Sequence, residues 1–124
     1  MSKALLVEDD EDNLFLFKTA LEGSFSEIDI LSHNNFTDAK KSFDAHNDEI
    51  RVIISDHLVG NEDSEMFFDF IQERDPKIPI ILVSAGIPKS KEYLAKVKKS
   101  EIHCFWQKPI PVEEIEEYIK MILC

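Results

Sequence analysis

Glycine is scarce in this sequence: 124 residues contain only Gly23, Gly60 and Gly86, and they lie far apart. Loops that bind the phosphates of nucleotides need several glycines within a few residues, because their backbone N–H groups must surround the phosphate oxygens. The sequence therefore argues against both a P-loop and a glycine-rich dinucleotide-binding loop.

Long apolar runs are also missing. A membrane-spanning helix needs about 20 consecutive apolar residues, and no run here approaches that length. The short apolar run near the N-terminus ends in acids, unlike a secretory signal peptide. The two cysteines, Cys104 and Cys124, lack the spacing of a metal site. We therefore expect a cytoplasmic protein with reduced cysteines.

Basic residues are outnumbered by acids. The chain has 14 Lys and Arg against 25 Asp and Glu, a net charge of −11. Such a surface repels nucleic acid and anionic lipid. Apolar residues make up 44% of the chain, enough for one core. We expect a single domain over residues 1–124 that binds neither nucleic acid nor a membrane directly.

Five short apolar runs have the character of strands that are buried on both faces. In the clearest one, Arg51–Asp56, three β-branched residues are followed by Ser55 and the carboxylate of Asp56. The other runs lie at residues 4–7, 28–31, 78–83 and 102–107. A charge at the end of a buried strand is costly unless the site uses it. Asp56 is therefore the first candidate for chemistry.

Helical periodicity follows each run, at residues 13–22, 35–46, 64–74, over about ten residues from Pro88, and at 112–123. In the first helix, Leu14, Phe17 and Leu21 should face the core. Phe15 and Leu16 widen its apolar surface; burial is the favoured interpretation, and a partner-binding patch is the alternative.

Three further expectations concern the third helix, the histidines and the second helix. The apolar stripe of the third helix should consist of Met66, Phe67, Phe70 and Ile71. His33 and His46 have no partner at a metal-site spacing, and we expect both at the surface. Phe36, Ala39 and Phe43 should point inward from the second helix.

Strands that alternate with helices predict an α/β fold with a parallel sheet covered on both faces. The expected architecture is a flavodoxin-like, doubly wound (βα)5 three-layer sandwich with a five-stranded sheet in the order 2-1-3-4-5. In that order, ligands bind at the switch point between the first and third strands. These strands end in Glu8-Asp9 and in Asp56.

Three carboxylates in one crevice repel each other, and a hard divalent cation relieves the repulsion. Oxygen ligands with room for water suit Mg²⁺. The fourth strand ends in the hydroxyl of Ser84, and the fifth is followed by the cation of Lys108. Acids, a hydroxyl and a lysine around a metal make a site for a phosphoryl group.

In the order and spacing of these residues, the chain resembles the receiver domain of two-component response regulators, from end to end. The matching positions are the acidic pair, the phosphoacceptor, the switch hydroxyl, the aromatic switch residue and the lysine with its following proline: Glu8, Asp9, Asp56, Ser84, Phe105, Lys108 and Pro109.

The resemblance implies that Asp56 accepts a phosphoryl group from the phosphohistidine of a histidine kinase or a histidine phosphotransfer protein. It implies a Mg²⁺ ion held by Asp9, Asp56 and the backbone carbonyl of Leu58, with Glu8 acting through a bound water. Lys108 would pair with a phosphoryl oxygen.

The resemblance also implies a switch. Ser84 would move to the phosphoryl group and Phe105 would turn inward behind it. This shift would remodel the face of the fourth helix, the last strand and the last helix, to which a downstream protein would bind. Because the sequence ends at Cys124, directly after the last helix, we expect the output to come from a partner protein. A homodimer stays an open alternative.

Several features depart from the pattern of the family, among them His57 directly after the phosphoacceptor and a stretch from Ser84 to Lys108 that is longer than usual. Gly60 stands where the family usually has proline, and Ser64 where it often has glycine. These departures concern the output face and leave the pocket residues in place. Leu58 and Gly86 are non-polar where receivers often have polar residues that position the hydrolytic water, so we expect slow hydrolysis of phosphorylated Asp56.

Three other interpretations remain. A receiver-like module could bind partners without phosphorylation, although the complete set of pocket residues speaks against it. Metal-dependent phosphatases of related topology use an Asp-x-Asp motif and a cap domain, whereas here the acids are adjacent and the chain is short. A plain flavodoxin-like domain would use these polar residues only as caps. We favour a receiver that switches a partner and is not itself an enzyme.

Overall fold

The computed structural model describes residues 2–24, 28–56, 58–60, 62–84, 104–107, 113, 116–117 and 120–121. Five strands form one parallel sheet: β1 (Ser2–Val7), β2 (Ile28–His33), β3 (Ile50–Asp56), β6 (Ile80–Ser84) and β7 (Cys104–Gln107). Their order is β2-β1-β3-β6-β7, which confirms the predicted order 2-1-3-4-5.

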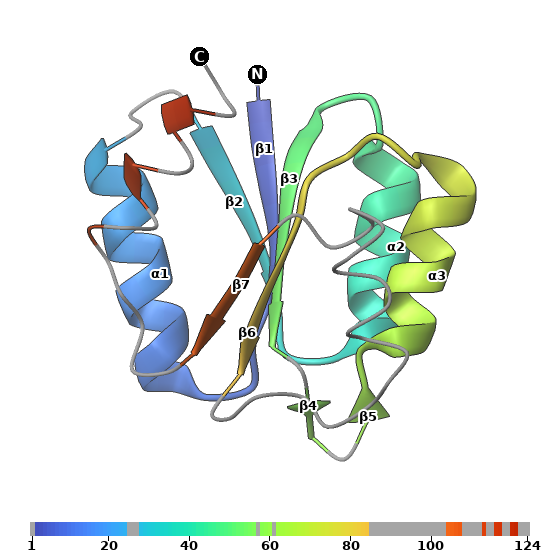
Figure 1. The fold of residues 1–124 in the computed structure, drawn as a ribbon, viewed down its shortest axis with the longest axis horizontal. Coiled ribbons are helices and arrows are strands. Elements are labelled where there is room, and N and C mark those ends of the chain that lie inside the picture. The colour runs from blue at the N-terminus through green and yellow to red at the C-terminus, as the bar shows by residue number, and fades with distance from the viewer. Residues whose placement is uncertain are drawn as a thin grey trace.

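Helices cover both faces of the sheet, as Figure 1 shows: α1 (Glu11–Ser24) lies on one side, and α2 (Phe36–His46) and α3 (Glu65–Arg74) lie on the other. Residues 113, 116–117 and 120–121 are helical, inside the predicted closing helix. The predicted fourth helix lies outside the described residues. In the described ranges, no helix has the length and apolarity needed to cross a bilayer.

The sheet separates two apolar cores, because successive side chains of a strand point to opposite faces. Ala4 and Leu6 of β1 pack with Phe17 and Leu21 under α1. Leu5 and Val7 belong to the larger core under α2 and α3, which contains Phe36, Ala39, Phe43, Phe67, Phe68 and Ile71. The burial predicted for the apolar residues of β1, β3 and β6, and for Phe36, Ala39 and Phe43 of α2, is therefore confirmed, whereas β2 is only partly buried.

Three apolar side chains for which burial was expected are exposed, so the sequence-based interpretation was wrong for them. Phe15 is 69% exposed and Leu16 is also exposed. They lie one and two residues after Leu14, so they are rotated away from the stripe that Leu14, Phe17 and Leu21 present to the sheet. Met66 is 76% exposed, and Phe68, absent from the predicted stripe, is buried in its place.

Side-chain caps set where the helices begin. In α1, Asp10 Oδ1 accepts hydrogen bonds from the backbone N–H groups of Asp12 and Asn13, at 2.9 and 3.1 Å. The helix therefore begins at Glu11, two residues earlier than predicted. In α2, Asn35 is the N-cap and accepts from the N–H of Asp38.

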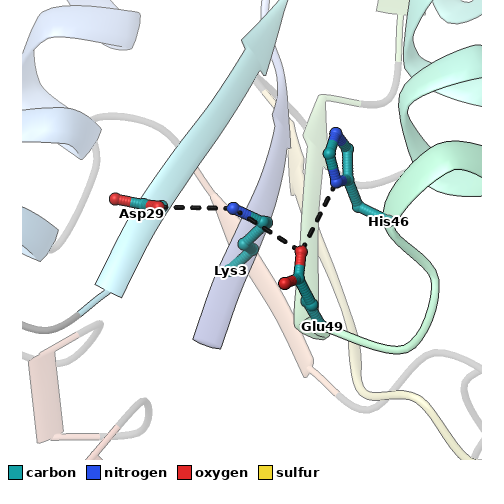
Figure 2. A network of polar contacts seen from close by, with 4 residues as sticks. All are labelled: Lys3, Asp29, His46 and Glu49. Carbon is teal, nitrogen blue, oxygen red and sulfur yellow. Dashed lines mark hydrogen bonds and ion pairs between the residues drawn. The ribbon is translucent and has the colours of Figure 1, made fainter. Parts of the chain in front are cut away.

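A network of charges ties three segments together at the end of the sheet where β1 begins (Figure 2). Lys3 Nζ lies 3.3 Å from Asp29 Oδ2 of β2 and 3.6 Å from Glu49 Oε2, just before β3. Glu49 Oε2 also lies 3.4 Å from His46 Nδ1 at the end of α2. Next to this network, the register of β1 against β3 shifts between Lys3 and Ala4.

His33 does not lie at the surface as predicted. It is half-buried at the end of β2, and its Nε2 atom has no hydrogen-bond partner within the described part of the chain. Burial penalises the charged imidazolium and lowers the pKa of His33, while the nearby charge of Asp38 opposes this shift.

Candidate functional site

The site begins with the alignment of β1 and β3. Val7, the last residue of β1, is paired with Ser55 of β3. In a parallel pair the next residue of each strand reaches the same edge of the sheet, and these residues are Glu8 and Asp56. The apolar strands thus bring together acids that lie almost fifty positions apart in the sequence.

The three predicted acids form one cluster. Glu8, Asp9 and Asp56 each offer a carboxylate oxygen, and these atoms all lie within 4.8 Å of one another. Glu8 is 1% exposed and Asp56 is 8% exposed, whereas Asp9 lies at the surface. Like charges this close repel each other, and burial strengthens the repulsion because little water screens it.

Hydrogen bonds from neighbouring segments hold two of these carboxylates. Glu8 Oε1 accepts from the backbone N–H of Asp10 at 3.2 Å and from Asn13 Nδ2 at 3.4 Å. Asp9 Oδ2 accepts from the backbone N–H of Gly60 at 2.8 Å. The start of α1 and the chain after β3 therefore both contact the cluster.

The donor set fits a hard divalent cation. All three side chains offer oxygen atoms, the exposed Asp9 leaves a side open to water, and such sites suit Mg²⁺ rather than softer metals. Within the described ranges, this is the one group of three or more His, Cys, Asp or Glu residues that is placed to hold a metal ion.

A small hairpin follows Asp56 in the chain. Strands β4 (Leu58–Val59) and β5 (Glu62–Asp63) pair antiparallel, Leu58 with Asp63 and Val59 with Glu62. Gly60 begins the two-residue connection with a φ of +62°, a left-handed conformation that glycine adopts without strain. The buried Val59 anchors the hairpin in the core under α2 and α3.

Asp63 and Ser64 then lead into α3. Asp63 Oδ1 accepts from the N–H of Glu65 at 2.8 Å, while the N-cap position itself is taken by Ser64, whose side chain makes no cap hydrogen bond.

The switch residues predicted at the ends of the last two strands are described only in their backbone. Ser84 ends β6, one residue beyond Val83, which is paired with Asp56. Phe105 lies in β7 and is paired with Leu82. Ser84 is paired with Gln107, the residue before Lys108. The sheet thus brings Ser84 to the edge at which Asp56 lies, and Lys108, Pro109, His57 and Gly86 lie outside the described residues.

Known proteins share this fold. The model of the family described as "Response regulator receiver domain" matches residues 4–120. A response regulator receiver domain protein from Clostridium thermocellum superimposes with a TM-score of 0.84 at 17% identity, covering 99% of this chain and 94% of that one.

Two further structures are equally similar in fold. The N-terminal domain of an uncharacterized protein from Wolinella succinogenes has a TM-score of 0.82 at 25% identity, with 99% and 94% coverage. A two-component response regulator from Clostridium difficile has a TM-score of 0.82 at 20% identity, with 99% and 96% coverage. No curated protein matches the sequence. Because the family model spans nearly the whole sequence, the chain belongs to the response regulator receiver domain family.

Proposed function

We propose that this receiver domain is phosphorylated on Asp56 by the phosphohistidine of a histidine kinase or a histidine phosphotransfer protein, and that phosphorylation switches a partner-binding face. One observation carries the proposal: the Asp56 carboxylate ends the central strand β3 within 4.8 Å of two further carboxylates.

In the proposed reaction, a carboxylate oxygen of Asp56 attacks the phosphorus atom. A P–O bond forms as the P–N bond to the donor histidine breaks, and the imidazole of the donor leaves. Because the transferred group keeps its negative charge, the surrounding acids oppose the reaction unless positive charge is supplied.

The oxygen ligands of the cluster support a Mg²⁺ ion as the source of this charge. Asp9 and Asp56 would hold the ion directly together with the backbone carbonyl of Leu58, and Glu8 would act through a water. When bound, the ion neutralises the carboxylates and the phosphoryl oxygens. We assign Lys108 to a phosphoryl oxygen and Ser84 to a hydrogen bond that forms after transfer, with Phe105 following it.

The consequence of phosphorylation would lie in binding rather than in turnover. The residues that change position, Ser84 and Phe105, belong to β6 and β7. A downstream protein would bind the face formed by the fourth helix, the last strand and the last helix. On this proposal the chain is a phosphoryl-controlled switch and has no catalytic product of its own.

The test is intact mass spectrometry after incubation with acetyl phosphate, with Mg²⁺ and with EDTA. The wild type should gain one phosphoryl group only with Mg²⁺, and Asp56→Asn should gain none. Asp48→Asn is the matched control, because Asp48 is exposed in the turn before β3, at the opposite end of the sheet. A folded wild type that gains nothing in Mg²⁺ would contradict the proposal and favour a module that binds partners without phosphorylation.

A further inference from the structure

The hydrogen bond between Gly60 and Asp9 joins the hairpin to the acid cluster. Its donor is a backbone N–H and its acceptor is Asp9 Oδ2, 2.8 Å away and 51 positions earlier in the chain. A hydrogen bond to a charged carboxylate is stronger than one between neutral groups. One oxygen of Asp9 therefore has a fixed direction before any ligand arrives.

The geometry of Gly60 makes this bond depend on the residue type. Its φ of +62° is favourable for glycine and costs most other residues free energy. Proline, which the family usually has at this position, fixes φ near −65° and has no N–H to donate. The contact is therefore one that a receiver with proline here cannot make.

The remainder of the hairpin holds the Gly60 N–H in place. Val59 is buried in the core under α2 and α3, and it is paired with Glu62 across the hairpin. The Gly60 amide thus belongs to a segment that is held in two ways: Val59 anchors it in the core, and the pairing of β4 with β5 fixes the hairpin. Because this donor is held in place, its hydrogen bond can restrain the side chain of Asp9, which is exposed and would otherwise be able to rotate.

From these contacts we infer that Gly60 is a positioning residue for the cation site, and that its N–H holds the Asp9 carboxylate in the orientation that binds Mg²⁺. This inference rests on the proposed function. Hydrogen bonds of this kind to a metal ligand fix its direction, and their loss typically lowers metal affinity about tenfold or more. Because linkage is reciprocal, Mg²⁺ should in turn stabilise the hairpin.

The side-chain space around Gly60 allows a graded set of variants. A Cβ atom added at Gly60 meets no heavy atom within 4 Å, so only the backbone conformation and the N–H limit the substitution. Gly60→Asn keeps the N–H and tolerates the left-handed conformation. Gly60→Ala keeps the N–H but disfavours that conformation, and Gly60→Pro removes both.

The first measurement is Mg²⁺ affinity by NMR titration of the four proteins, with folding checked by urea denaturation in EDTA. We expect Gly60→Asn to bind like the wild type and Gly60→Pro to bind about tenfold more weakly, with Gly60→Ala between them. If Gly60→Pro does not fold, Gly60→Ala carries the comparison. Equal affinity in the wild type and in the folded Pro or Ala variant would overturn the inference.

A second measurement reports on the contact without Mg²⁺: hydrogen exchange of the Gly60 amide. Exchange should accelerate in Asp9→Ala, which lacks the acceptor. The Asp38 amide is the internal control, because it donates to Asn35 Oδ1 at the same 2.8 Å and should not change. An unchanged Gly60 amide would refute the positioning role. A wild type that binds no Mg²⁺ at all would instead refute the metal site of the proposed function. The two measurements therefore distinguish failure of the positioning role of Gly60 from failure of the proposed metal site.

Discussion

The ammonium group of Lys3 lies 3.3 Å from the carboxylate of Asp29, so the first strand is tied to the edge strand β2 at the end of the sheet remote from the acid cluster (Figure 2). Glu49 approaches the same ammonium at 3.6 Å. The side chain of Lys3 is only 14% exposed, which shields these pairs from water more than ordinary surface ion pairs.

Replacing this lysine should therefore lower stability. We expect Lys3→Met, which keeps most of the apolar stem, to reduce the free energy of unfolding by about 0.5–1 kcal/mol. Lys41→Met on the exposed side of α2 is the control and should change little. Urea denaturation at low and high salt measures both, and the deficit of Lys3→Met should shrink as salt screens the pairs. Equal effects of the two variants would refute this prediction.

The first helix offers a comparison of two phenylalanines that are two residues apart. Phe17 is fully buried under α1, whereas Phe15 projects from the helix. Phe17→Ala should cost about 3–5 kcal/mol, because it leaves a cavity in the core. Phe15→Ala should stay within about 0.5 kcal/mol of the wild type. Thermal or urea denaturation decides this, and a large loss in Phe15→Ala would show that this side chain is buried after all.

His33 predicts how stability changes with pH. Its pKa in the folded protein is below the usual 6.5, so the unfolded chain binds more protons between the two values. The free energy of unfolding should therefore rise with pH through this window. The contribution of His33 to stability is present above the unfolded pKa and is lost as the pH falls through the folded pKa. His33→Gln has no proton to bind at this position. The difference in free energy of unfolding between this variant and the wild type should change between pH 8 and about pH 5.5. A difference that stays constant over this range would contradict the prediction.

If Asp56 is phosphorylated as proposed, the lifetime of the phosphoryl group should depend on two residues that lie close to the site in the sequence. Neither Leu58 nor Gly86 has a polar side chain that could orient a water molecule for attack on the phosphoryl group. We expect slow hydrolysis, and the double variant Leu58→Asn, Gly86→Glu should lose its phosphoryl group several times faster. Intact mass against time after removal of the phosphodonor measures the rate. A phosphoryl group that persists no longer on the wild type than on the double variant would contradict this prediction.

The sequence was sufficient to predict the sheet and the acid cluster, because both depend on strong local patterns. A run of β-branched residues such as Val52–Ile54 strongly favours a buried strand, and the carboxylate of Asp56 two residues after this run is conspicuous. The strand order then brings Glu8 and Asp9 to Asp56 with no further information.

What the sequence did not reveal has physical reasons. The hairpin strands have two residues each, and one consists of Glu62 and Asp63, so no apolar alternation marks it. The Gly-Asn pair between Val59 and Glu62 was the available indication of a tight hairpin. The contact of Gly60 with Asp9 uses a backbone donor, which leaves no trace in the side-chain pattern. Helix α1 was assigned too much burial because apolar residues surround most of it.

The burial of the apolar parts of β1 and β3 has a consequence for how a misfolded sheet could be detected. Ala4–Val7 and Val52–Ser55 are shielded from water on both faces, so a sheet in which β1 had slipped along β3 would still bury much of the same apolar surface. Such a slip would separate Glu8 and Asp9 from Asp56. The ability to bind a divalent cation would then distinguish correctly aligned molecules from misaligned ones that are equally compact.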